Sequence, residues 1–422
     1  MKLTILSNAF HPEPIGIAAH MAELAEALAQ HGHEVQVATV FPHYPHWIIQ
    51  PHYRGKLWAQ EEWQGCRVLR TWMRVSRKPT FVAKMIYYLS FTISSALGSL
   101  SWGRQDLVLV SSPPPSLILT ACFYRMLHRT RTVLSIADLL PDTAVALGMI
   151  KNKWVIKVLY AFEKWCYRQS DHIVVISDAF RHNLLQKGVP PEKISVVYTW
   201  ANTDFIRPLP KDNSFREKHE LGDKFVVLYA GNIGISQGLE TLLEAARQIQ
   251  EDPSVQFVIV GDGTTKADLQ RRAEQMELSN VVFLPLQPRE DLPLLYGAAD
   301  VCVVLQKKTV LDINVPGKIQ TIMSAGRAMI AATHPQGIPA KLVRDSGGGL
   351  LIAPENAAEL AEAIQKLRRQ PELRAVMGNA GRRYALKHFS LRSAVRSYMD
   401  IFGQALAADQ QALPRKQSSA EA

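Results

Sequence analysis

The feature that most constrains the fold is a regular alternation of short apolar runs with segments of helical periodicity. Residues 3–7 predict a strand, residues 18–31 place apolar side chains at helical spacing, and residues 34–40 predict the next strand. Gly32 stands just after the helix, where a terminating glycine is expected. A strand–helix–strand rhythm of this kind favours a parallel sheet covered by helices on both faces.

The same rhythm continues in two series. The first series has further strands at residues 107–111, 132–136, 172–176 and 194–198, and a short helix at 181–187. The second has strands at 225–229, 256–260, 281–284, 301–305, 328–332 and 349–352, with helices at 239–250, 265–276, 318–325 and 357–368. The sequence therefore predicts an α/β fold of two doubly wound domains in tandem.

A polar stretch at residues 204–225, containing Pro208 and Pro210, interrupts the periodicity and marks the joint. We expect a first domain at residues 1–205 and a second at 206–390. A last helix at 391–408 is expected to pack back on the first domain. The polar residues 409–422 predict a disordered tail.

The net charge of +10 is unevenly distributed. Residues 1–200 contain 21 Lys and Arg against 13 Asp and Glu, whereas residues 201–422 contain 27 against 25. An anionic partner is therefore expected to meet the first half, and nucleic acid, an anionic membrane or a phosphorylated substrate would each fit. The four cysteines lie far apart with no CxxC pair, which argues against a disulfide framework or structural zinc. The first ten residues lack the long apolar stretch of a secretory signal and predict a strand instead.

Residues 85–103 contain no charged side chain. Their length approaches that of a membrane span, but several serines make the segment polar. Its larger apolar residues recur at spacings of three and four, so they share one helical face, and basic residues precede them in the sequence. Three interpretations stay open: a helix that covers the sheet, an amphipathic helix on an anionic lipid surface, and a true span.

Ligands of open α/β sheets bind beyond the carboxyl ends of the strands, so the loops after strands carry the candidate residues. The loop at 231–238 is rich in glycine and leads to the helix predicted at 239–250. Its candidates are Gly231, Asn232 and Gly234. Free backbone N–H groups at such a helix start suit a phosphate. The loop lacks the GK[ST] triplet of a Walker A motif.

A second anion site is predicted where Pro316, Gly317 and Lys318 begin a helix. Lys318 adds a full positive charge beside the helix dipole, and Lys307 and Lys308 end the preceding strand. Two helix starts and up to three lysines form a plausible diphosphate cradle. The alternative is that these lysines are ordinary solvated surface residues.

Other strand-following loops add weaker candidates. Gly16 would let a ligand approach the backbone, or it is a plain turn glycine. Gly261, Asp262 and Gly263 form a permissive turn, in which Asp262 could instead cap the next helix. Asp138 could position an acceptor hydroxyl, whereas the nearby Asp142 could be a helix cap. His43 and His46 lie three residues apart and are candidate metal ligands, but no carboxylate or cysteine nearby completes a set, so no metal is expected.

The ordered pieces of this sequence resemble the GT-B glycosyltransferases, most closely the retaining enzymes of family 4, over nearly the whole chain. The pieces that carry the resemblance are Pro14-Ile15-Gly16, His31-Gly32-His33-Glu34-Val35, Asp138-Leu139-Leu140-Pro141-Asp142, Ile176-Ser177, Gly231-Asn232-Ile233-Gly234, Val260-Gly261-Asp262-Gly263 and Ala298-Ala299-Asp300. Residues 299–308 followed by Val315-Pro316-Gly317-Lys318 resemble the colanic-acid type of exopolysaccharide enzyme. The resemblance implies two Rossmann-like domains that face a central cleft.

The resemblance also implies a function. It implies a hexosyltransferase that moves a sugar from a nucleotide diphosphate donor, with GDP-fucose as one guess, to a glycan linked to undecaprenyl diphosphate. It implies retention of anomeric configuration, no metal or other cofactor, and no nucleic-acid partner. The base of the nucleotide would lie near Gly261–Gly263 and Leu284–Leu286, which include Pro285, and Asp138 and the Gly16 loop would face the acceptor. The protein is expected in the cytoplasm, peripherally on the anionic inner face of the membrane.

The sequence departs from the family-4 pattern at two places. The usual pair of glutamates aligns with Ile313 and Thr321, and the usual basic pair aligns with Asn232 and Gln237. Lys318, with Lys307 or Lys308, would then have to supply the positive charge. These departures keep two alternatives open: a non-catalytic subunit that binds nucleotide sugars, and a nucleotide-sugar epimerase.

Overall fold

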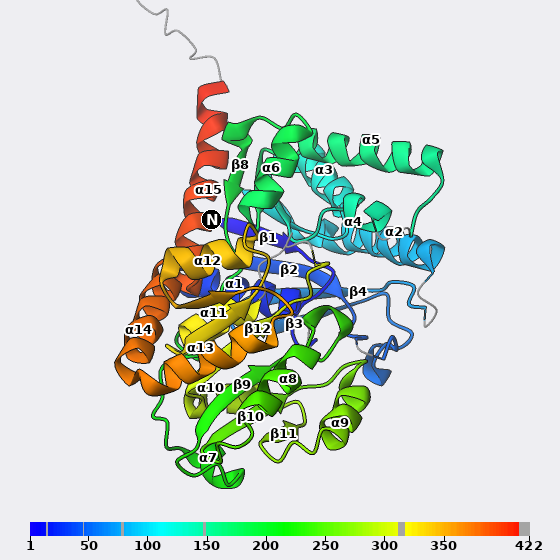
Figure 1. Cartoon of the computed structure of the whole chain (residues 1–422). Helices are drawn as coiled ribbons and strands as arrows, with labels where there is room; N and C mark the ends of the chain where they lie inside the picture. Colours follow the sequence, from blue (N-terminus) through cyan, green and yellow to red (C-terminus); the bar gives the residue numbers. More distant parts are fainter. Residues whose placement is uncertain (14–15, 45, 77–79, 147–148, 311–316, 413–422) are drawn as a thin grey trace, which may run out of the picture. The chain divides into compact units, whose positions relative to one another are not determined.

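The computed structural model describes residues 1–412 apart from 14–15, 45, 77–79, 147–148 and 311–316. The chain divides into two compact units, each built around its own sheet (Figure 1). The first unit consists of Met1–Tyr198 together with the chain from Ala394 onward, and the second consists of Thr199–Ser393. The division after Tyr198 lies slightly before the boundary expected at 205.

The sheet of the first unit has eight strands in the order β3-β4-β2-β1-β5-β6-β7-β8. Their bounds are β1 Lys2–Leu6, β2 Glu34–Val40, β3 Trp58–Trp63, β4 Cys66–Thr71, β5 Leu107–Ser112, β6 Arg131–Ile136, β7 His172–Val175 and β8 Ile194–Val196. All pairs are parallel except β3 and β4, which form an antiparallel hairpin at one edge. This antiparallel hairpin at one edge was not predicted from the sequence.

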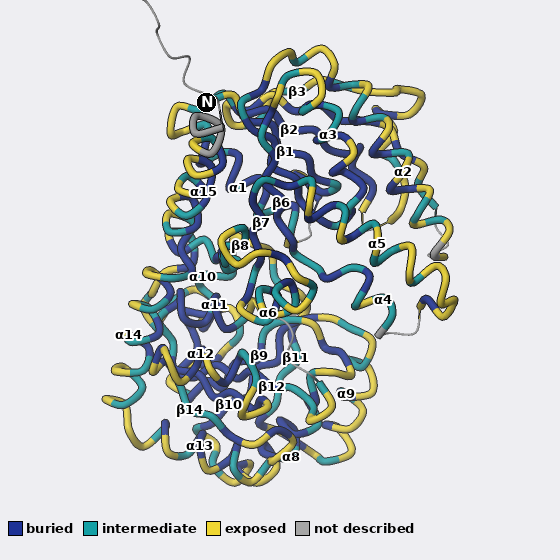
Figure 2. Tube along the Cα trace, turned by 90° about the horizontal axis from the view of Figure 1, so that it is seen from above, coloured by how far each residue is buried: buried dark blue, intermediate teal, exposed yellow. Residues whose placement is uncertain are grey.

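The helices of the first unit pack a large apolar core against its sheet, as the dark segments in Figure 2 show. Their bounds are α1 Gly16–Gln30, α2 Phe81–Gly98, α3 Leu117–His128, α4 Asp142–Ala146, α5 Lys153–Gln169 and α6 Asp178–Gln186. Helix α3 packs against both α2 and α5. The sequence analysis did not identify α3 and α5. None of the helices in the described part of the chain is both long and apolar enough to cross a membrane.

The second unit has a fully parallel sheet in the order β11-β10-β9-β12-β13-β14. The strands are β9 Phe225–Ala230, β10 Val255–Val260, β11 Val281–Leu284, β12 Val301–Leu305, β13 Ala328–Ala332 and β14 Gly349–Ile352. The helices are α7 Ser214–Lys218, α8 Glu240–Ile249, α9 Lys266–Gln275, α10 Leu292–Ala298, α11 Gly317–Ser324, α12 Ile338–Ser346, α13 Ala357–Arg369 and α14 Pro371–His388. The strand order reverses between β9 and β12, and such a switch point is where open α/β sheets bind ligands.

The last helix, α15, runs from Leu391 to Ala412. Its Tyr398 hydroxyl lies 3.2 Å from Oγ of Ser135 on β6, so this part of the helix packs within the first unit. The helix continues through residues 409–412, where the sequence predicted the start of a disordered tail. The rest of that predicted tail, residues 413–422, lies outside the described residues.

Candidate functional site

Three glycines let the loops after β9 and β10 approach each other closely. Gly231 and Gly261 have φ angles of 141° and 147°, which only glycine adopts easily. A Cβ on Gly261 would lie 1.9 Å from the carbonyl oxygen of Gly231, and a Cβ on Gly263 would lie 2.3 Å from that of Ile233. The backbone N–H of Ile233 donates to the carbonyl of Asp262 at 2.8 Å, which joins the two loops. The glycines therefore fix the carboxyl edge of this sheet.

The loop after β9 presents backbone donors at that edge. The N–H groups of Asn232 and Gly234 have no hydrogen-bond acceptor among the described residues, whereas the N–H of Ile233 between them is used. The loop does not run directly into an α-helix, as the sequence analysis expected. A 3₁₀ turn at Ile235–Gln237 and left-handed Gly238 come first, and α8 begins at Glu240. Because Glu240 places a carboxylate in the first turn of α8, that helix start suits an anion less well than predicted.

Lys318, in the first turn of α11, reaches back to the loop after β9. Its ammonium group donates to the hydroxyl of Tyr229 at 2.6 Å and to Oε1 of Gln237 at 3.0 Å. It also lies 4.0 Å from the centre of the Tyr229 ring, in a cation–π contact. A Cβ on Gly231 would come within 3.2 Å of the ammonium. The absence of a side chain at residue 231 therefore leaves room for the Lys318 side chain.

The surroundings of Lys318 supply hydrogen bonds but no counter-charge. Among the described residues, no carboxylate forms an ion pair with it, and both of its acceptors are neutral. Burial lowers the pKa of Lys318 to about 7. A nearby anion would favour the charged form of this lysine. Gln237 holds the ammonium beside the loop.

The structure brings Lys307 to the same loop but not Lys308. The backbone N–H of Lys307 donates to the carbonyl of Ser236 at 3.0 Å, and its side chain packs on Gly238. Lys308 is exposed and its backbone N–H binds the carboxylate of Glu355 at 3.1 Å. Lys307 therefore contacts the loop after β9, to which Lys318 also reaches. Lys308 is instead bound through its backbone to Glu355, just after β14.

The other predicted site residues of the second unit take part in different local contacts. Gly317 begins α11, and Pro316 lies outside the described residues. Thr321 donates its hydroxyl to the carbonyl of Gly317 at 3.1 Å, so that group is engaged within its own helix. Asp262 accepts the N–H of Gly263 at 2.8 Å rather than capping α9, and Pro285 is exposed at the end of β11.

In the first unit, Asp138 follows β6 and is half-buried. Its carboxylate accepts the hydroxyl of Thr143 at 2.9 Å. Asp142 begins α4 and is the centre of a network with Tyr160 of α5, Asn183 of α6 and Lys187 just after α6. Gly16 begins α1, and a Cβ there would meet nothing within 4 Å.

A buried pair that was not predicted from the sequence lies at the carboxyl edge of the first sheet. Glu13, in the loop after β1, accepts the backbone N–H groups of His43 and Tyr44, each at 3.0 Å. The His43 ring nitrogen Nδ1 lies 3.1 Å from the same carboxylate oxygen. No sequence signal indicated this pairing, because it joins loops that follow two different strands.

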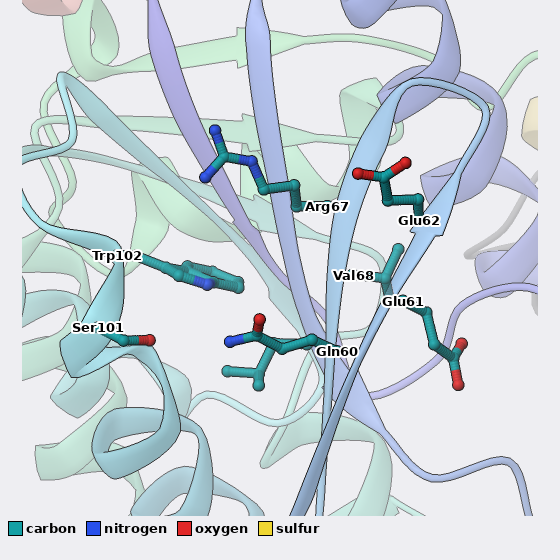
Figure 3. A pocket seen from close by; sticks show the side chains of 8 residues that line it. Gln60, Glu61, Glu62, Arg67, Val68, Ser101 and Trp102 are labelled. Atoms are coloured by element: carbon teal, nitrogen blue, oxygen red, sulfur yellow. The ribbon is translucent and has the colours of Figure 1, made fainter.

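A surface hollow of about 480 Å³ lies elsewhere on the first unit (Figure 3). Its lining side chains come from β3, β4 and the turn after α2: Gln60, Glu61, Glu62, Arg67, Val68, Leu69, Ser101 and Trp102. None of the candidate residues lines it, and it lies at the hairpin edge rather than at the ends of parallel strands. Its Glu61 is already bound to Tyr53 and Arg70.

The chain matches two family descriptions in tandem. "Glycosyl transferase 4-like domain" matches residues 16–200, and "Glycosyl transferases group 1" matches residues 211–384. A glycosyl transferase assigned to colanic acid biosynthesis in Escherichia coli K12, WcaI, is 30% identical over 96% of this chain and 100% of its own length. EpsD of Bacillus subtilis, described as a glycosyltransferase, is 30% identical over 60% of this chain and 66% of its own.

Solved structures share the fold along nearly the whole chain. A sucrose-phosphate synthase from Thermosynechococcus elongatus superposes with a TM-score of 0.69 at 20% identity, covering 96% of this chain and 99% of its own. The Anabaena protein HepE in complex with UDP superposes with a TM-score of 0.69 at 16% identity, covering 96% and 100%. At these identities the likeness establishes the two-domain architecture alone.

Proposed function

Because this chain belongs to the GT-B glycosyltransferases of family 4, and to their exopolysaccharide type, we propose that it transfers a sugar from a nucleotide diphosphate donor to a lipid-linked oligosaccharide. We propose that transfer retains the anomeric configuration and needs no metal. The donor would bind the second unit, and the acceptor would bind the first. The observation that carries the donor half is the ammonium group of Lys318. Within the described part of the chain its hydrogen-bond partners are neutral, and it lies beside a loop whose amides at Asn232 and Gly234 have no acceptor there.

The edge of the second sheet has the chemistry of a diphosphate site. Two N–H groups, at Asn232 and Gly234, can donate to phosphate oxygens, and Lys318 adds positive charge beside them. Lys307 contacts the same loop at Ser236 and Gly238. The helix dipole of α11 points its positive end in the same direction. The complex of HepE with UDP supports a nucleotide in this fold, as does that of the same protein with UDP-glucose. For the present chain the nucleotide base and sugar stay open, and GDP-fucose is one donor to test.

These residues would act on the leaving group. As the bond between the sugar C1 and the phosphate oxygen breaks, negative charge grows on the diphosphate, and preorganised donors stabilise that charge. The acceptor oxygen forms the new bond to C1 on the same face, and its proton passes to the departing phosphate. Lys318 thus takes the role that the missing basic pair has in related enzymes.

Ligand-dependent melting tests the donor half. We expect one of the UDP-, GDP- or dTDP-sugars to raise the melting temperature in a concentration-dependent way. Lys318→Ala should weaken this binding by about 10- to 100-fold, because it removes a charge-assisted contact. The matched control is Lys366→Ala, an exposed lysine on α13, which should bind as the wild type does. If no nucleotide sugar raises the melting temperature, the proposal is wrong.

Turnover separates an enzyme from a binding subunit. Lys318→Ala should lower sugar transfer or donor hydrolysis by at least about 100-fold while the fold is kept. A wild-type protein that binds a nucleotide sugar without any turnover would support the non-catalytic alternative. Interconversion of the free nucleotide sugar without an acceptor would support the epimerase.

An apolar face on the first unit supports a lipid-linked acceptor. Helices α2, α3 and α5 lie together (Figures 1 and 2). Each carries exposed large apolar side chains. We name these residues the apolar face: Val82, Ile86, Leu89, Ile93, Leu97, Leu119, Met126, Leu127, Trp154, Val155 and Val158. Ile93 is 60% exposed and Trp154 is 76% exposed, which is costly in water and favourable at a lipid interface.

The charges around the apolar face fit an anionic membrane. Residues 64–105 and all of α3 contain no Asp or Glu, and the only carboxylate of α5, Glu163, is buried. Exposed lysines and arginines surround the apolar residues: Arg74, Lys84, Arg129, Lys151, Lys153 and Lys157. We therefore propose peripheral attachment to the anionic inner face of the cytoplasmic membrane, rather than the sheet-covering role alone.

Liposome co-sedimentation tests this attachment. We expect binding to vesicles of phosphatidylcholine with phosphatidylglycerol, and much weaker binding to phosphatidylcholine alone. Ile93→Glu should abolish it, whereas Val376→Glu, at an equally exposed valine on α14 of the second unit, should leave it unchanged. Equal binding to neutral and anionic vesicles would contradict the proposal.

A further inference from the structure

The pair formed by Glu13 and His43 has a geometry that fixes one tautomer of the histidine. Nδ1 of His43 lies 3.1 Å from the carboxylate of Glu13 and 3.0 Å from the carbonyl oxygen of Phe41. Both neighbours only accept hydrogen bonds, so Nδ1 carries a proton. In the neutral ring, Nε2 is then a bare acceptor. Among the described residues Nε2 has no hydrogen-bond partner.

Burial holds the side chains of Glu13 and His43 in this arrangement. The side chains of His43 and Glu13 are only 5% and 3% exposed. Burial by itself would raise the pKa of Glu13, but hydrogen bonds from the His43 ring and from the backbone of His43 and Tyr44 lower it below the ordinary value. The carboxylate is therefore ionised and holds the ring in place. Nε2 is not among the fully enclosed unpartnered polar atoms of the described residues, so a ligand hydroxyl can still reach it.

Two aromatic rings surround the histidine. The rings of Trp47 and Tyr87 each lie 5.4 Å from the His43 ring and 6.3 Å from each other. Trp47 remains 41% exposed, and its φ of 55° lies in the left-handed region that bulky residues rarely adopt. Such strain is kept where the surrounding structure requires that side chain at that place.

We propose that His43 and Trp47 bind the terminal sugar of the acceptor. The apolar face of the sugar ring would lie on Trp47, and one hydroxyl would donate to Nε2 of His43. Glu13 is the positioning residue, because it sets the tautomer and holds the loop after β2. A half-exposed aromatic ring beside one oriented polar group matches a ligand with an apolar face and peripheral hydroxyls. This inference rests on the proposed function and names the residues of its acceptor half.

The place of α2 in the first unit fits this assignment. Its buried side carries Tyr87 to the proposed sugar site, and Tyr88, whose pKa is raised by burial and by the charge of Asp138. Its opposite side carries residues of the apolar face, including Ile86 and Leu89. One helix therefore faces a sugar site on one side and a lipid surface on the other, as a lipid-linked sugar requires.

The test uses free sugars, so that neither the lipid nor the donor is needed. Saturation-transfer NMR on the full chain would be recorded with the methyl glycosides of glucose, galactose, fucose and N-acetylglucosamine. At least one should receive saturation at its ring protons from the wild type. Trp47→Ala should weaken that binding by about tenfold. Trp58→Ala, at an exposed tryptophan of β3, is the matched control and should have no effect.

His43 is tested with two variants that separate its ring nitrogens. In His43→Asn the amide NH₂ can still donate to Glu13, so the loop keeps its anchor, but the acceptor at Nε2 is lost. We expect several-fold weaker glycoside binding with an unchanged melting temperature. Glu13→Gln should lower both glycoside affinity and melting temperature. The substitution weakens the hydrogen bonds that hold the loop after β2 and the preference for the Nδ1–H tautomer of His43.

The outcomes distinguish this inference from the proposed function. Binding of no glycoside by the wild type, or equal loss in Trp58→Ala, would overturn the sugar site even if a nucleotide sugar binds the second unit. Failure of every nucleotide sugar to bind, with the glycoside effects intact, would overturn the donor proposal instead. Unchanged glycoside binding in His43→Asn would remove His43 from the site.

Discussion

At the scale of single residues, Lys318 gives nucleotide binding a pH dependence. Burial lowers the pKa of Lys318 to about 7, so in the free protein the ammonium loses its proton as the pH rises above that value. A bound diphosphate favours the charged lysine and raises its pKa. Binding should therefore take up a proton above about pH 7, and affinity should fall as the pH rises, by up to about tenfold per pH unit.

Calorimetry checks this linkage between about pH 7.5 and 9, where a terminal phosphate is already ionised. Titrations of UDP and GDP in buffers of different ionisation enthalpy should reveal the proton uptake. Lys318→Arg should remove the slope, because a guanidinium stays charged throughout this range. A wild-type affinity that is independent of pH would contradict the lowered pKa.

Gly261 shows how one missing Cβ supports the site. In Gly261→Ala the new carbon would meet the carbonyl oxygen of Gly231 at 1.9 Å, at a φ that alanine rarely adopts. We expect a loss of stability well above about 1 kcal/mol and weaker nucleotide binding. Gly403→Ala, in an open position within α15, should instead stabilise by about 0.5–1 kcal/mol. Thermal unfolding of both variants measures the difference.

Single residues of the candidate site differed in how far the sequence could predict them. The glycines could be predicted because they lie in loops directly after strands, and Lys318 because it lies at a helix start marked by Pro316 and Gly317. The role of Tyr229 and Gln237 as partners of Lys318 could not be predicted, because it depends on how α11 lies against β9. The same holds for Glu13 and His43, whose contact needs the register of β1 and β2.

At the scale of elements, Asp300 joins three parts of the second unit. Its carboxylate accepts from the guanidinium of Arg216 and from the backbone N–H of Val226, each at 2.9 Å, and pairs with Lys211 at 2.9 Å. Both Asp300 and Arg216 are buried, so a desolvated ion pair joins α7 to the residue before β12, and the hydrogen bond from Val226 joins that residue to the start of β9. Removing one partner would leave an uncompensated buried charge.

Asp300→Asn should therefore destabilise the protein by about 3–5 kcal/mol, as measured by urea unfolding. The control is Asp268→Asn, which breaks the exposed pair with Arg271 and should cost less than about 1 kcal/mol. Comparable losses in the two variants would show that burial does not set the strength of the Asp300 cluster.

Strands made of nearly continuous apolar residues were the elements that the sequence predicted well. The six strands of the second sheet are nearly continuous apolar runs, and their predicted positions agree with the structure within a few residues. The hairpin β3–β4 was missed because edge strand β3 alternates exposed and half-buried side chains and carries two glutamates. Helix α5 was missed because its apolar residues are divided between the core and the exposed apolar face.

At the scale of the whole molecule, the two units present different chemistry to different ligands. The first carries the apolar face with a basic surround and no exposed carboxylate on α2, α3 or α5, whereas the second carries the glycine loops with Lys307 and Lys318. Each unit has its own apolar core. A lipid surface and a nucleotide should therefore protect separate parts of the chain.

Hydrogen exchange measured by mass spectrometry can resolve the two footprints. A nucleotide sugar should slow exchange at residues 229–240 and 317–321, where free amides and helix-start amides gain acceptors. Anionic vesicles should slow exchange in α2 and α5 and leave those segments of the second unit unchanged. Ile93→Glu should erase only the lipid footprint, and Lys318→Ala only the nucleotide footprint. If a nucleotide sugar protected α2, or vesicles protected residues 229–240, donor and acceptor recognition would not be divided between the units, because each unit would then respond to the ligand assigned to the other.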